Sequence, residues 1–134
     1  MTTRRFLAVF GFFILVFGAC PPLRADDKVP VCNAMDRPCL LKQIEALGPS
    51  IDKQDWKDQT YRELAKTYAY EGQTDKAIAL IPQIVDNDTK AMTIRGIGMA
   101  AASLKWQQSQ YRNLFIKLAE QAALINHPPS QGIA

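Results

Sequence analysis

Histidine is nearly absent from this sequence, and cysteine is scarce. The 134 residues include one histidine and three cysteines. His127 precedes Pro128-Pro129 near the C-terminus, where we expect a mobile surface residue rather than a general base. Cys32 and Cys39, with one distant histidine, are too few ligands for a zinc site. The sequence therefore predicts a protein that is not an enzyme and that holds no metal ion and no cofactor.

An excess of positive charge is also lacking once the N-terminus is set aside. The chain has 16 Lys and Arg against 13 Asp and Glu, a net charge of +3. Arg4, Arg5 and Arg24 account for the whole excess, and the other basic side chains balance the acidic ones in number. A formally neutral body has no broad basic surface. We therefore expect no nucleic-acid partner.

Residues 1–25 have the layout of a secretory signal peptide. Two arginines precede an apolar run over 6–19 that contains no charge and no strongly polar group, and the small residue Ala25 precedes Asp26. A spanning helix needs about 20 apolar residues, so this run is short for a membrane anchor. We predict an exported bacterial protein with cleavage after Ala25. The mature protein would be periplasmic or secreted.

Two alternatives for the N-terminus stay open. Residues 17–20 (FGAC) resemble a bacterial lipoprotein signal, in which small residues precede a cysteine that becomes acylated, here Cys20. Phe17 departs from that pattern, which usually has leucine at this position. The other alternative is an uncleaved N-terminal anchor. Either one would tether the protein to the envelope, and we expect contact with a membrane only through this segment.

The cysteine count agrees with export. Cleavage removes Cys20 and lipidation consumes it, so both leave Cys32 and Cys39 as an even pair. An oxidising compartment would favour a bond between them, and a loop this short contributes about 2–3 kcal/mol to stability. We predict that this disulfide staples residues 26–54, which form an extended lead-in and a capping helix.

From residue 37 onward the apolar residues recur at helical spacing, without strand-like alternation of useful length. Asp36 and Pro38 predict the start of a helix over 37–47 that stops at Gly48-Pro49. Its expected apolar face consists of Leu40, Leu41, Ile44 and Leu47. Further helices are predicted from about 55 to 69, over 75–85, over 89–104 and over 111–125.

Individual residues predict where these helices kink, begin and pack. Pro82 predicts a kink or a short first part in the helix over 75–85, and Asp88 is expected to cap the next helix. Gly96 and Gly98 predict that another backbone approaches closely. We expect Trp56 and Trp106 to pack in the core or against a cap. Residues 130–134 form either a loose tail or an element completed by a partner.

Residues 55–85 resemble a tetratricopeptide repeat. They carry an aromatic residue, Leu followed by a small residue, Tyr, a turn glycine and an Ala–large series, at Tyr61, Leu64, Ala65, Tyr68, Gly72, Ala77 and Ile81. One repeat later, Ile97-Gly98 correspond to Leu64-Ala65, and Phe115, displaced by one position more, corresponds to Ile81. Ile84 and Lys105 depart from the family pattern. The resemblance implies a domain over 55–134 with an all-α fold, a short right-handed array of antiparallel helical hairpins.

In tetratricopeptide proteins the first helix of each hairpin lines a concave groove that binds extended peptides. The resemblance places six residues on that groove: Gln59, Arg62, Lys66, Tyr70, Arg95 and Met99. The three cations can receive a carboxylate or an acidic segment. Alternatively, Asp58–Arg62 and Glu63–Lys66 are ion pairs on a solvated helix face.

The resemblance implies a non-catalytic module that binds a protein or peptide partner through this shallow groove. The alternative is a structural protein of the envelope, tethered through Cys20 or an uncleaved N-terminus.

Overall fold

Helices are the regular elements of the computed structural model, which describes residues 31–134. The expectations for residues 1–25, including the signal peptide and lipidation at Cys20, lie outside the described residues. The predicted all-α class is confirmed for the described part. Its elements in chain order are α1 (Arg37–Leu47), η1 (Gly48–Ser50), α2 (Gln54–Tyr70), α3 (Thr74–Leu80), η2 (Ile81–Gln83), α4 (Asn87–Ala102), α5 (Gln108–Ala123) and α6 (Pro128–Gln131), where η denotes a 3₁₀-helix.

Helix α1 begins as predicted. The Asp36 side chain accepts a hydrogen bond from the backbone N–H of Cys39 at 3.1 Å, and proline occupies the first turn. Cys32 and Cys39 form the predicted disulfide, with their Cα atoms 5.7 Å apart. The expected apolar face is only partly buried, since Leu41 is covered but Ile44 and Leu47 are 43% and 54% exposed. Helix α1 contacts the adjoining η1 and α2, and these contacts leave part of its apolar face uncovered.

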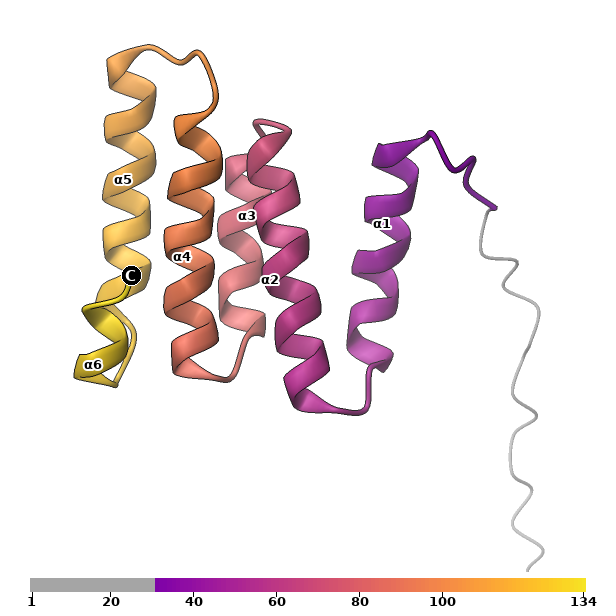
Figure 1. Ribbon diagram of the computed structural model, residues 1–134, viewed down its shortest axis with the longest axis horizontal. Coiled ribbons are helices and arrows are strands. Elements are labelled where there is room, and N and C mark those ends of the chain that lie inside the picture. Colours follow the sequence, from indigo (N-terminus) through magenta and orange to yellow (C-terminus); the bar gives the residue numbers. More distant parts are fainter. Residues whose placement is uncertain (1–30) are drawn as a thin grey trace, which may run out of the picture.

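Helices α2 and α3 form an antiparallel pair joined by a tight turn at Gly72 (Figure 1). Gly72 has φ +74°, a left-handed conformation that glycine adopts without steric cost. The following N–H, that of Gln73, donates back to the carbonyl of Tyr68 at 2.8 Å and so satisfies the end of α2. Pro82 shortens the second helix as predicted, because α3 ends at Leu80 and the chain continues as η2.

The start of α4 differs from the prediction. Asp86, not Asp88, is the N-cap, and its carboxylate accepts from the backbone N–H of Thr89 at 2.7 Å. Hydrogen bonds from the side chain and then the backbone of Thr89 lower the pKa of Asp86 below its usual value. Asp86 has extended backbone (φ −68°, ψ 127°), the conformation that lets a cap side chain reach the third helical residue. The helix therefore begins earlier than expected, at Asn87.

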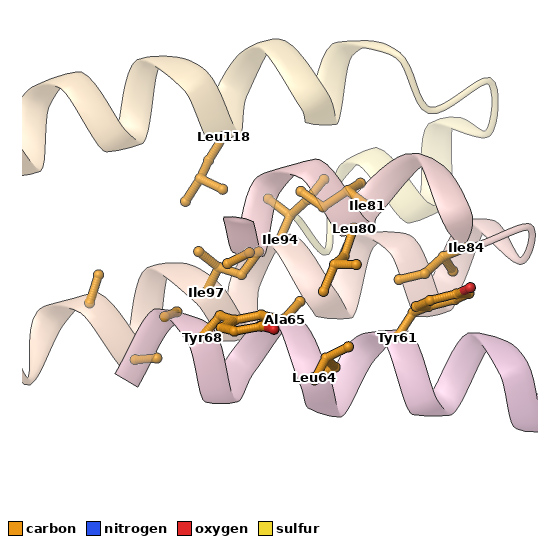
Figure 2. Packing of buried hydrophobic residues seen from close by; sticks show 14 of the residues in the cluster. Tyr61, Leu64, Ala65, Tyr68, Leu80, Ile81, Ile84, Ile94, Ile97 and Leu118 are labelled. Atoms are coloured by element: carbon orange, nitrogen blue, oxygen red, sulfur yellow. The ribbon is translucent and has the colours of Figure 1, made fainter. Parts of the chain in front are cut away.

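The core lies where α2, α3, α4 and α5 meet. Figure 2 shows Tyr61, Leu64, Ala65 and Tyr68 on one helix beneath residues of the neighbouring helices, with Leu118 pointing in from α5. Tyr68 is 2% exposed, and its hydroxyl donates to a carboxylate oxygen of Glu45 on α1 at 2.7 Å. Burial, followed by this hydrogen bond, raises the pKa of Tyr68 to about 12. Tyr68 thus joins the capping helix to the core.

Asp58 on α2 is a buried carboxylate, 1% exposed. It accepts hydrogen bonds from the backbone N–H groups of Val85 and Asp86 at 3.1 and 2.8 Å, and from Gln54 at 2.7 Å. It therefore holds the linker between η2 and α4 against α2. The expected ion pair of Asp58 with Arg62 is wrong, because both carboxylate oxygens face these donors instead.

The two tryptophans have different surroundings. Trp56 is 68% exposed, and Lys53 lies over its ring at 5.6 Å, so the prediction of core packing is wrong for this residue. It lies in the first turn of α2, where no helix of the described part covers its ring. Trp106 does pack against the core, with the ring of Tyr111 at 5.7 Å between centroids.

The C-terminal residues are docked rather than loose. They form the short helix α6, which contacts α4. Ser130 is fully buried, and its hydroxyl donates to Asp88 at 2.5 Å, while His127 Nδ1 lies 2.5 Å from the same hydroxyl oxygen. Contacts within the chain therefore order this element. Among the helices of residues 31–134, none has the length and apolarity to cross a membrane.

Candidate binding groove

Five of the six residues predicted for the groove lie together between α2 and α4. These two helices run side by side in the array (Figure 1). The depression between them has a volume of about 370 Å³. Its lining consists of Arg62, Lys66, Tyr70, Met92, Arg95, Gly96 and Met99. Sequence reasoning missed Met92, although it precedes Gly96 by one helical turn and so shares its face.

Gln59 does not join the other five. It lines a separate depression between α1 and α2, together with Leu41 and Ile44. Gln59 precedes Arg62 by just under one helical turn, and the packing of α1 against this part of α2 places it in a different depression. The groove is therefore shorter at its N-terminal end than the repeat pattern predicts.

Gly96 allows the side chain of Lys66 to pack closely on α4. A Cβ atom built on Gly96 would lie 3.0 Å from Cγ of Lys66, so the missing side chain lets the lysine stem lie across α4. At Gly98 an added Cβ would lie 3.3 Å from the ring of Phe115 on α5. The two glycines do permit close packing, but the groups that approach them are side chains, not the backbone that we expected.

The groove carries more positive than negative charge. Arg62 and Lys66 both pair with Glu63 at 2.9 Å. The hydrogen bond from Lys66, and then that from Arg62, lowers the pKa of Glu63 below its usual value. Arg95 is exposed and has no ion-pair partner among residues 31–134. The three cations Arg62, Lys66 and Arg95 thus outnumber the one carboxylate that pairs with them, that of Glu63, which lines the neighbouring α1–α2 depression.

Apolar atoms frame these charges. Tyr70, Met92 and Met99 are 55%, 51% and 64% exposed. Large apolar side chains exposed together in a depression are typical of binding surfaces, and flexible methionines adapt to varied partners. The arrangement can hold an elongated chain with apolar side chains against the methionines and a carboxylate against the cations.

A serine, a histidine and an aspartate also meet, which the sequence did not suggest. Ser130 lies between the other two, since it bonds to both Asp88 and His127. In a hydrolytic triad the histidine stands between serine and carboxylate, and the serine is accessible. Here the serine is fully buried and donates directly to the carboxylate. This cluster therefore fastens α6 to the start of α4.

Metal ligands do not gather in the described part of the chain. Within residues 31–134 no three side chains of the His, Cys, Asp or Glu type lie close enough to hold a metal ion.

Comparison with protein-family models, with curated proteins and with solved structures finds no match. What the groove binds is therefore inferred from its own shape and charge.

Proposed function

We propose that the protein is a non-catalytic interaction module whose α2–α4 groove binds an extended, acidic segment of another protein. The observation that carries this proposal is the meeting of Arg62, Lys66, Tyr70, Arg95 and Met99 around one depression. The repeat register selected these residues, and the excess of cations favours a carboxylate-bearing partner.

The arrangement of the helices supports a tetratricopeptide-like architecture in this proposal. Helices α2 with α3, and α4 with α5, form successive hairpins, and α4 packs against both members of the first. Ala65 and Gly98, which hold corresponding positions in the two repeats, are both buried small residues on the first helix of a hairpin. Stacked hairpins of this kind share a core that neither could form alone.

Arg95 and Lys66 offer the sharpest test of the groove. Acidic peptides selected from a displayed library on the full mature chain should bind about tenfold more weakly to Arg95→Glu and to Lys66→Glu, because each reversal replaces attraction with repulsion. Lys105→Glu is the matched control, since Lys105 is an exposed cation outside the groove lining. Titration calorimetry measures the three affinities. Equal weakening in all three variants, or no weakening in the groove variants, would contradict the proposal.

We also propose export to the periplasm or beyond, with cleavage after Ala25. The disulfide between Cys32 and Cys39 supports it, because such bonds persist in oxidising compartments. The second candidate, a structural protein tethered to the envelope, is favoured by the cysteine at position 20 after Gly18-Ala19. Mass spectrometry of the mature N-terminus distinguishes them: export predicts a free Asp26, and tethering predicts a diacylglyceryl Cys20 or an intact Met1.

A further inference from the structure

A second depression lies between α4 and α5, and it shares Arg95 and Met99 with the depression between α2 and α4. Its volume is about 570 Å³, and Ile94, Gly98, Met99, Ala102, Phe115 and Leu118 form most of its lining. Phe115 and Met99 are 50% and 64% exposed, whereas Leu118 at its base is 4% exposed. Arg95 is the one lining residue with a charged side chain, and Ala119, Ala122 and Ala134, the last from the segment after α6, complete the lining. We call this depression the α4–α5 groove.

The α4–α5 groove corresponds, in the repeat register, to the surface of α2 and α3 on which α4 packs. In the repeat register, Gly98, Met99 and Ala102 correspond to Ala65, Lys66 and Ala69 of α2. For the second helix of each hairpin the register includes one additional residue. Phe115 and Leu118 of α5 then correspond to Ile81 and Ile84 of the first hairpin.

Burial differs between the two copies at two positions, although Gly98 and Leu118 are buried as Ala65 and Ile84 are. Ala69 and Ile81 are 0% and 1% exposed, because α4 packs on α2 and α3. Their counterparts Ala102 and Phe115 are exposed, since among residues 31–134 no long helix packs on α4 and α5 from that side. The occupant that fits this surface is therefore a helix placed as α4 is placed on the first hairpin.

Charge specifies the occupant further. Glu63 forms an ion pair with Arg62 and with Lys66 on α2. The residue of α4 that corresponds to Glu63 is Gly96, so Arg95 lacks the carboxylate that its counterpart Arg62 has. An arginine beside an apolar groove, with no carboxylate paired to it, favours a partner that brings one. A second copy of this chain in a two-fold arrangement would instead bring Arg95 towards Arg95, which like-charge repulsion disfavours.

The register of α4 on α2 predicts where that carboxylate stands. Gly96 lies against Lys66, and Met92, one turn earlier, lines the same depression as Arg62, one turn before Lys66. We now place the partner helix on α4 as α4 lies on α2. A small residue of the partner, in the place of Gly96, would then lie against Met99, and the residue four positions before it would lie near Arg95.

From this we propose that the α4–α5 groove binds an amphipathic helix of another protein, parallel to α4, with an acidic residue four positions before a small one. This site shares Arg95 and Met99 with the α2–α4 groove but takes a helix in place of an extended segment. It rests on the repeat register proposed above, but not on the binding of an extended segment.

The probe is a synthetic peptide of residues 86–102 of this chain carrying Met92→Glu, with a staple joining positions 95 and 99 to hold it helical. Arg95 and Met99 are exposed when α4 is seated in its own molecule, so the staple would face solvent. We expect saturable binding to the full mature chain, with amide NMR shifts concentrated at Gly98, Ala102 and Ala119. A peptide with Met92→Lys is the matched control and should bind about tenfold more weakly.

Two variants of the protein locate the site. Ala119→Trp should block binding of the stapled peptide, because Ala119 is exposed and lines the groove, and Ala79→Trp is the control at an exposed alanine of α3. Arg95→Glu should weaken binding of the glutamate peptide and strengthen that of the lysine peptide. Circular dichroism melting checks that each variant is folded. If Ala119→Trp unfolds, the opposite effects of Arg95→Glu on the affinities for the glutamate and lysine peptides test the site instead.

Three results would overturn the proposal. They are the absence of saturable binding at millimolar peptide, equal affinity for the glutamate and lysine peptides, and shifts confined to the α2–α4 groove. A dimer of the chain in sedimentation that Ala119→Trp abolishes would likewise overturn it, since the occupant would then be a second copy.

Discussion

At the scale of single residues, Asp58 is a buried carboxylate whose role is structural. It accepts from two backbone N–H groups of the linker before α4 and from Gln54. Asp58→Ala would leave those N–H groups without an acceptor, so we expect the free energy of unfolding to fall by about 2–4 kcal/mol. Urea denaturation measures it, with the exposed Asp55→Ala as control. A loss as small as that of the control would show that water replaces the carboxylate.

Tyr68 gives stability a dependence on alkaline pH. The pKa of its hydroxyl is about 12 in the folded protein against an ordinary value of 10.0. Because the pKa is higher in the folded than in the unfolded protein, the protonated hydroxyl contributes fully to the free energy of unfolding below about pH 10. This contribution is lost as the pH rises towards 12. Tyr68→Phe removes both the hydrogen bond to Glu45 and this titration.

Wild type and Tyr68→Phe should therefore converge in stability at high pH. At neutral pH the hydrogen bond to the Glu45 carboxylate should make the wild type more stable by about 1–2 kcal/mol. The difference should narrow above pH 10, as measured by urea denaturation of both proteins across that range. A difference that stays constant up to pH 12 would contradict the raised pKa.

Two predictions about single residues, the N-cap of α4 and the ion pair of Asp58, failed because an aspartate can accept hydrogen bonds from alternative partners. Asp86 and Asp88 are both suitable N-cap residues. Asp86 caps α4, whereas Asp88 accepts a hydrogen bond from Ser130, which is distant in the sequence. Asp58 stands one helical turn before Arg62, yet the linker N–H groups take its carboxylate. Such long-range competition leaves no trace in local spacing.

At the scale of elements, α6 shows how a short helix depends on tertiary contacts. A single helical turn is not stable alone, and the buried hydroxyl of Ser130 joins this one to α4. The sequence signal at this point is the proline pair, which marks the end of α5 but equally suits the first turn of a new helix. Only the pairing with Asp88 distinguishes a docked turn from a tail.

Ser130→Ala should release α6 without unfolding the rest. The change removes the hydrogen bonds to Asp88 and His127, and we expect amide hydrogen exchange at Gly132 and Ile133 to accelerate while α2 stays protected. Ser109→Ala, at an exposed position of α5, is the control. Unchanged exchange in Ser130→Ala would mean that other contacts, such as the hydrogen bond from Gln131 to the carbonyl of Ile125, hold the element.

Helix ends were predictable where glycine or proline determines the backbone. Gly72 follows α2 with a positive φ, and Pro82 lies two residues after the last residue of α3, as their chemistry requires. Burial was less predictable, because it depends on which neighbour covers each face. Ile44 and Trp56 are apolar at positions of helical spacing, but no helix of residues 31–134 covers them fully.

At the scale of the whole molecule, the repeat register that we propose relates residues of α2 to residues of α4. Arg62 corresponds to Arg95, Lys66 corresponds to Met99, and all four converge on the depression between α2 and α4. Five of the six residues that the register predicted line this depression. The register did not predict that Gln59 lies apart, because α1 follows no repeat pattern. The charge balance of the groove depends on Glu63, which the spacing with Lys66 did indicate.

The central claim is that the α2–α4 groove receives an acidic segment, and an NMR titration of the isotope-labelled mature chain tests it most directly. An acidic, extended peptide selected on the protein should shift the signals of Arg62, Lys66, Tyr70 and Arg95 in a saturable manner. The methyl group of Met99 should respond with them, and the signals of α1 should stay in place. Shifts centred on Gln59 and α1, or spread evenly over exposed lysines, would contradict the claim.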